Sequence, residues 1–160
     1  MLLLKGLIIL NLIYIIVQDI KNRKVYWFLF PSLLMLLGYL HYKNVLPIHF
    51  KNSIVINIGV IVSIMLILYA YARIIMKRSF FKDVFGLGDA LFFTVLAVAF
   101  PTISFIILFV FSILFSLFTW LITKKNAKHE TIPLAGYMSL FFIFIFLGNW
   151  ITDTINLYII

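Results

Sequence analysis

Long runs of apolar residues, separated by short polar or basic segments, fill nearly the whole chain. Several runs approach or exceed the roughly 18 to 20 residues that an α-helix needs to cross a bilayer. The runs are continuous, whereas transmembrane β-strands alternate apolar and polar residues. The pattern therefore predicts an all-α fold, a polytopic membrane bundle of about six transmembrane helices. These helices are expected at residues 2–18, 25–40, 54–76, 90–100, 103–122 and 132–150.

The composition leaves almost no room for a separate soluble domain. Of the 160 residues, 65% are hydrophobic and 11% are charged, and the mean hydropathy is +1.19. Soluble domains carry about 45–50% apolar and about 25% charged residues. We therefore expect one integral membrane domain over residues 1–160. The chain contains no cysteine, which excludes disulfides, thiol nucleophiles and cysteine-ligated metals.

The net charge of +8 would suggest nucleic acid as a partner of a soluble protein. Here the basic residues cluster between the predicted helices, where they contact lipid headgroups and set the topology. We therefore expect contact with membrane lipid and no nucleic-acid binding. Lys5, Lys43 and Lys51 fall on one predicted side of the membrane. The other ten basic residues fall on the opposite side, at Lys21, Arg23, Lys24, Arg73, Lys77, Arg78, Lys82, Lys124, Lys125 and Lys128.

Two carboxylates stand out against this topology. The positive-inside rule places the side with ten basic residues in the cytoplasm and both termini outside. Asp19 and Asp89 then both fall at cytoplasmic ends of predicted helices, at similar depth. An ionisable residue at the edge of a span is costly and suggests a functional site. The two side chains would meet if the first and fourth helices pack together.

Two carboxylates that lie close together can hydrolyse a peptide. Like charges a few ångströms apart do not both ionise easily, so one group stays protonated. The ionised group can take a proton from water while the protonated group polarises the scissile carbonyl, without a metal or cofactor. Gly86 and Gly88, just before Asp89, are expected to permit strained turns and a close approach of substrate backbone.

Simpler interpretations exist for each residue taken alone. An aspartate beside lysines at a membrane edge can be a solvated residue or a helix cap, and Gly-x-Gly-Asp can be an ordinary turn with an N-cap. His41 and His49 fall in a predicted outside loop with no carboxylate nearby, so we expect no metal site there. The aspartyl hypothesis depends on two carboxylates that are predicted to lie at the same depth and on the same side of the membrane.

Three segments together resemble the type IV prepilin peptidase family, the GxGD-type intramembrane aspartyl proteases that include the preflagellin peptidases. The first segment is Asp19-Ile20-Lys21-Asn22-Arg23-Lys24-Val25-Tyr26, and the second is Gly86-Leu87-Gly88-Asp89. The third is Ile132-Pro133-Leu134-Ala135-Gly136-Tyr137. They occur in the family's order and with plausible spacing, so that the resemblance extends over nearly the whole chain.

The resemblance implies an aspartic endopeptidase with Asp19 and Asp89 as catalytic residues. It implies supporting or substrate-binding roles for Gly86, Gly88 and Pro133. The implied substrate is a prepilin-like precursor, in which a short basic leader precedes a hydrophobic helix and is removed after a small residue. The implied location is the inner (plasma) membrane, with a multi-pass chain and a cytoplasmic active site.

The chain also departs from the family's pattern. Tyr26 stands where proline is usual, and Ala90-Leu91 replaces the Asp-x-Lys continuation after the second aspartate. The cysteine-containing segment of the larger members, associated with N-methylation, has no counterpart here, so we expect cleavage without methyl transfer.

Two other hypotheses remain beside the peptidase. One is a non-enzymatic membrane subunit, a transport or assembly component, that uses both aspartates for a cation or a partner's basic helix. Ion pathways need polar groups through the depth of the membrane, and the middles of these helices contain few. The other is an inactive relative of the peptidase, suggested only by the departures at Tyr26 and Ala90-Leu91.

Overall fold

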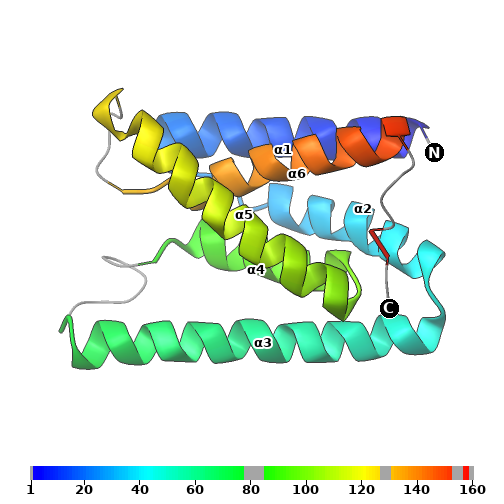
Figure 1. Ribbon diagram of the computed structural model, residues 1–160, viewed down its shortest axis with the longest axis horizontal. Coiled ribbons are helices and arrows are strands. Elements are labelled where there is room, and N and C mark those ends of the chain that lie inside the picture. Colours follow the sequence, from blue (N-terminus) through cyan, green and yellow to red (C-terminus); the bar gives the residue numbers. More distant parts are fainter. Residues whose placement is uncertain (1, 78–84, 127–130, 153–156, 159–160) are drawn as a thin grey trace.

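The computed structural model describes residues 2–77, 85–126, 131–152 and 157–158, and these residues form helices and short connections without a strand. The predicted all-α bundle is confirmed (Figure 1). The helices are α1 (Leu2–Asn22), α2 (Leu29–Asn44), α3 (Pro47–Ile74), α4 (Leu87–Ala99), α5 (Thr102–Thr123) and α6 (Leu134–Thr152), and the 3₁₀ turn η2 (Lys124–Asn126) extends α5.

Four helices, α1, α3, α5 and α6, are each long and apolar enough to cross a bilayer, which indicates a membrane-embedded protein. The other two are shorter, with 16 residues in α2 and 13 in α4. At 1.5 Å per residue α4 is about 20 Å long, less than the roughly 30 Å of the hydrocarbon core. The described residues thus form six α-helices, as predicted, but only four of them are long and apolar enough to cross a bilayer.

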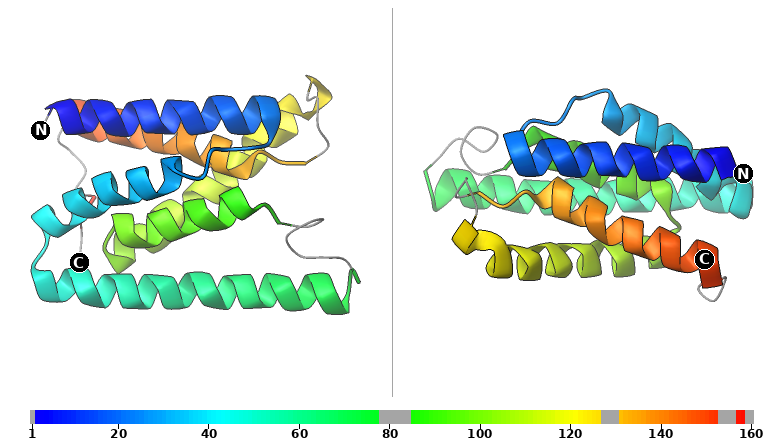
Figure 2. Two further views of the ribbon diagram at one scale, coloured as in Figure 1. Left: turned by 180° about the vertical axis from the view of Figure 1, so that it is seen from behind. Right: turned by 90° about the horizontal axis from the view of Figure 1, so that it is seen from above.

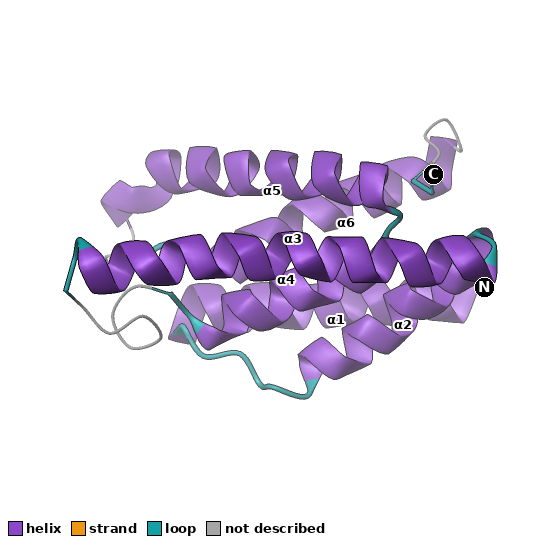
Figure 3. Cartoon of the chain, turned by 90° about the horizontal axis from the view of Figure 1, so that it is seen from below, coloured by secondary structure: helices purple, strands orange, loops and turns teal. Residues whose placement is uncertain are grey.

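The contacts between the helices bring together segments that are distant in the sequence. α6 contacts α1 and α5, and α4 contacts α2 and α3. Figures 1 and 2 show that α1, α3 and α5 end at the same end of the bundle, where α4 and α6 begin. We call this the site end. The view in Figure 3 shows α2 joined to α1 by an extended connection on the outside of the bundle.

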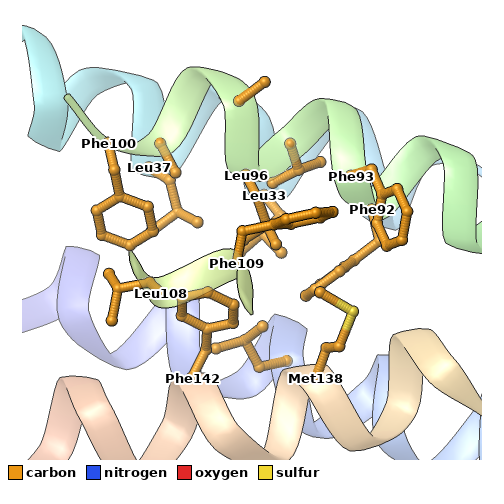
Figure 4. Packing of buried hydrophobic residues seen from close by; sticks show 14 of the residues in the cluster. Leu33, Leu37, Phe92, Phe93, Leu96, Phe100, Leu108, Phe109, Met138 and Phe142 are labelled. Carbon is orange, nitrogen blue, oxygen red and sulfur yellow. The ribbon is translucent and has the colours of Figure 1, made fainter. Parts of the chain in front are cut away.

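Phenylalanine and leucine side chains from several helices fill the centre of the bundle (Figure 4). The ring of Phe142 in α6 lies 5.7 Å from that of Phe100 and 6.3 Å from that of Phe92, measured between centroids. Inside a membrane the hydrophobic effect does not drive helices together, so close packing of this kind supplies much of the attraction. This packing holds the middle of α6 beside α4.

Polar side chains bind the backbone where α4 ends. Pro101 follows α4 and cannot donate to the preceding carbonyls, so these lack partners within the helix. Asn57 donates from Nδ2 to the carbonyls of Ala97 and Phe100, both at 2.9 Å, and the His41 ring nitrogen Nδ1 donates to the Val98 carbonyl at 2.8 Å. Unpaired backbone groups cost several kcal/mol in a bilayer, which explains these buried polar residues.

The predicted outside loop is mostly helical. His41 and Lys43 belong to α2, and His49 and Lys51 belong to α3, so only residues 45–46 connect the two helices. His41 is completely buried rather than solvated. The prediction was wrong because polar side chains suggested a loop, whereas His41 faces inward to bind α4.

Candidate active site

The first turn of α6 offers two backbone amides to the site end. Pro133 is buried and immediately precedes α6, and its carbonyl accepts the Tyr137 amide at 3.0 Å. The amides of Ala135 and Gly136 fall before the first residues that find partners within a helix. They point outward at the positive end of the helix dipole, where negative groups are favoured.

Asp89 binds the first of these amides. It lies in the first turn of α4, where its Oδ1 accepts the Ala135 amide at 2.9 Å. The N-cap of α4 is Gly86, whose carbonyl accepts the Asp89 amide at 3.1 Å. The alternative in which Asp89 is the N-cap of its own helix is therefore incorrect, because its side chain binds α6 instead.

Asp19 binds the second amide. It belongs to the last turn of α1, which extends to Asn22, four residues beyond the predicted end of the first span. Its Oδ2 accepts the Gly136 amide at 2.7 Å, and the residue is only 8% exposed. Because Ala135 and Gly136 are consecutive, the two bound carboxylate oxygens lie within about 9 Å of each other.

The two aspartates meet by a different route from the one expected. The sequence suggests that the two side chains would meet if the first and fourth helices packed together, but α1 and α4 share no extensive contact. Both contact α6 instead, and its first turn binds both carboxylates. The arrangement can hold two negative groups side by side because backbone donors and the helix dipole offset part of their repulsion.

A strained turn is one of the roles predicted for the glycines before Asp89. Gly86 has φ −72° and ψ 136°, an extended conformation that any residue adopts, so the prediction of a strained turn was wrong. Space is what limits this position, because a Cβ at Gly86 would lie 2.9 Å from Asp89 Oδ2. At Gly88 a Cβ would lie 3.6 Å from Phe30, an ordinary contact that requires no glycine.

Gly136 is a site residue to which the sequence assigned no role beyond its place after Pro133. A Cβ there would lie 3.1 Å from Asp19 Oδ2 and 3.2 Å from Asp19 Cβ. The small residue therefore lets α1 approach the start of α6. A small residue in the first turn of a helix, after a proline, is the only sequence signal for this contact.

The departure at Tyr26 has a structural explanation. The Tyr26 amide donates to Gln18 Oε1 at 2.9 Å, and this bond ties the connection after α1 back to the residue beside Asp19. A proline has no amide hydrogen and would lose the bond. The other departure, Ala90-Leu91, lies in α4, with Leu91 41% exposed. Arg78, Lys82 and Lys128 lie outside the described residues.

The described residues contain no group of three histidine, aspartate or glutamate side chains placed to hold a metal ion. The donors around Asp19 and Asp89 are backbone amides.

Comparison of the chain with protein-family models, with curated proteins and with solved structures found no match.

Proposed function

We propose that this protein is an intramembrane aspartyl endopeptidase that removes short basic leaders from prepilin-like precursors. One observation carries the proposal: Asp19 and Asp89, 70 positions apart, accept hydrogen bonds from the consecutive amides of Ala135 and Gly136. The resemblance of three segments to the prepilin peptidases supplies the substrate class. The location proposed for the reaction is the cytoplasmic face of the plasma membrane, supported by the basic residues of the site end.

In the proposed reaction the pair holds one proton. The ionised carboxylate takes a proton from water as the water oxygen attacks the scissile carbonyl carbon. The protonated carboxyl donates its proton to the carbonyl oxygen, which gives a tetrahedral intermediate. Proton transfer to the amide nitrogen then lets the carbon–nitrogen bond break. The α6 amides orient both carboxylates for these transfers.

The same hydrogen bonds also favour a second candidate, a non-enzymatic membrane subunit or inactive relative. Carboxylates that bind the first turn of a helix from two other helices can serve folding alone, because they satisfy amides that would otherwise be unpaired in the membrane. This candidate predicts that loss of either carboxylate lowers the amount of folded protein and affects no precursor.

Co-expression with a panel of prepilin-like precursors separates the candidates. Asp19→Asn and Asp89→Asn keep the size of each side chain and remove its ionisable group. We expect the native protein to shorten at least one precursor by its leader, measured by mass spectrometry, and either variant to abolish this at unchanged membrane levels. Cleavage that survives both substitutions would refute the aspartyl mechanism, and loss of both variants from the membrane would favour the folding role.

A further inference from the structure

Arg23 begins the connection after α1 in an unusual backbone conformation. Its φ is 54°, in the left-handed region that residues with a Cβ adopt at a cost. Its amide donates to the Asp19 carbonyl at 3.2 Å, which matches the bond that closes a helix with a left-handed residue. Glycine is the usual residue at such a position. A long cationic side chain there indicates that its contacts compensate for the strain.

The Arg23 side chain crosses from α1 to the segment that leads into α6. Its Nη2 donates to the Thr131 carbonyl, two residues before Pro133. Its guanidinium also lies over the Trp120 ring of α5, with Cζ 5.8 Å from the ring centroid. A planar guanidinium suits both contacts, and an ammonium group suits them less well. Arg23 therefore links the end of the Asp19 helix to the start of the helix that binds both carboxylates.

The charge of Arg23 acts on the same site. Burial lowers the pKa of the Arg23 guanidinium, whereas the negative charges of Asp19 and Asp89 raise it. Tyr137 shares a hydrogen bond of 2.8 Å with Thr123. Among the described residues, Arg23 is the charged group outside the pair that acts on both carboxylates.

We propose that Arg23 is a positioning residue that locks the end of α1 to the start of α6 and supplies the positive charge that lets Asp19 and Asp89 share one site. The inference rests on the proposed function for its catalytic meaning. Its test does not need a precursor, so its result is independent of whether any precursor is cleaved.

Infrared titration of the protonated carboxyl groups tests the proposal. The chain has only five acidic residues, and difference spectra against Asp19→Asn and Asp89→Asn assign the bands of the pair. Loss of a nearby positive charge disfavours the ionised form, so Arg23→Gln is expected to move the titration midpoint of the pair upward by about one pH unit. The matched control is Lys24→Gln, which removes the same charge from the exposed neighbouring residue.

The control is expected to change the midpoint by less than about 0.3 pH units, because solvent screens an exposed charge. A midpoint that Arg23→Gln leaves unchanged, or that Lys24→Gln moves equally, would overturn the proposal. Should Arg23→Gln fail to fold, Arg23→Lys provides the second test, because it keeps the charge. It is expected to titrate within about 0.5 units of the native protein, and a shift of a full unit would refute the role of the charge.

Discussion

Gly136 lies where the first turn of α6 meets the last turn of α1, and its amide holds the Asp19 carboxylate at 2.7 Å. Gly136 contributes both its backbone amide and the absence of a side chain. The amide supplies a donor that any residue except proline would supply, and the missing side chain supplies the space. The sequence could predict Asp19 and Asp89 because carboxylates are rare in this chain. It could not predict the Gly136 amide as a partner of Asp19, because every residue except proline has a backbone N–H and the sequence does not show which one binds a carboxylate.

Gly136→Ala is expected to impair the site without impairing the helix. The new Cβ would lie 3.1 Å from Asp19 Oδ2, so the carboxylate must shift by a few tenths of an ångström or more. Small misplacements of catalytic groups lower rates strongly, and we expect precursor cleavage to fall about tenfold to a hundredfold. Alanine is the better helix former by up to about 1 kcal/mol, so the free energy of unfolding should not decrease much.

The matched control is Gly148→Ala in the same helix, where a Cβ meets nothing within 4 Å. It should leave the cleavage rate within about twofold of the native value. Native cleavage by Gly136→Ala would mean that close approach of Asp19 to α6 is not needed for the reaction.

At the scale of the elements, hydrogen bonds tie both ends of the short helix α4 to other helices. The Asp89 side chain joins the first turn of α4 to α6, and the side chains of Asn57 and His41 donate hydrogen bonds to the last carbonyls of α4. Hydrophobic runs predicted that α4 exists and ends near Pro101. They misplaced the start of α2, expected at residue 25 and found at Leu29, because apolar character alone does not distinguish helix from the exposed aromatic connection before it.

Asn57→Ala is expected to destabilise the bundle through α4. It removes the two 2.9 Å hydrogen bonds to the Ala97 and Phe100 carbonyls at a completely buried position. Interhelical hydrogen bonds in membranes are worth about 0.6 to 1.7 kcal/mol each, so we expect a loss of about 1–3 kcal/mol in the free energy of unfolding. Asn52→Ala removes an exposed asparagine from the same helix and serves as the control. Equal effects of the two substitutions would contradict the role given to Asn57.

At the scale of the whole molecule, six helices bring three distant segments to one end of the bundle (Figure 1). The alternation of helices across the membrane predicted this, since the ends of the first, third and fifth helices must share a side. The partner helix was not predictable, because hydrophobic patterns do not specify which helices pack. The two aspartates meet through α6 rather than through direct packing of the first and fourth helices, and the first turn of α6 lies between Asp19 and Asp89.

Asp19 and Asp89 share one site at the start of α6, and chemical cross-linking tests this arrangement directly. The chain contains no cysteine, so the double variant Asp19→Cys with Asp89→Cys carries only two thiols. The control pair is Asp19→Cys with Lys51→Cys, because Lys51 lies in the first turns of α3, at the opposite end of the bundle. Each pair is treated in membranes with a short bifunctional thiol reagent, and the intact mass is measured.

We predict that the site pair gains one bridging group per molecule, because the two carboxylates lie within about 9 Å. The control pair should gain two separate adducts. Two separate adducts on the site pair, as on the control pair, would contradict a shared site for Asp19 and Asp89.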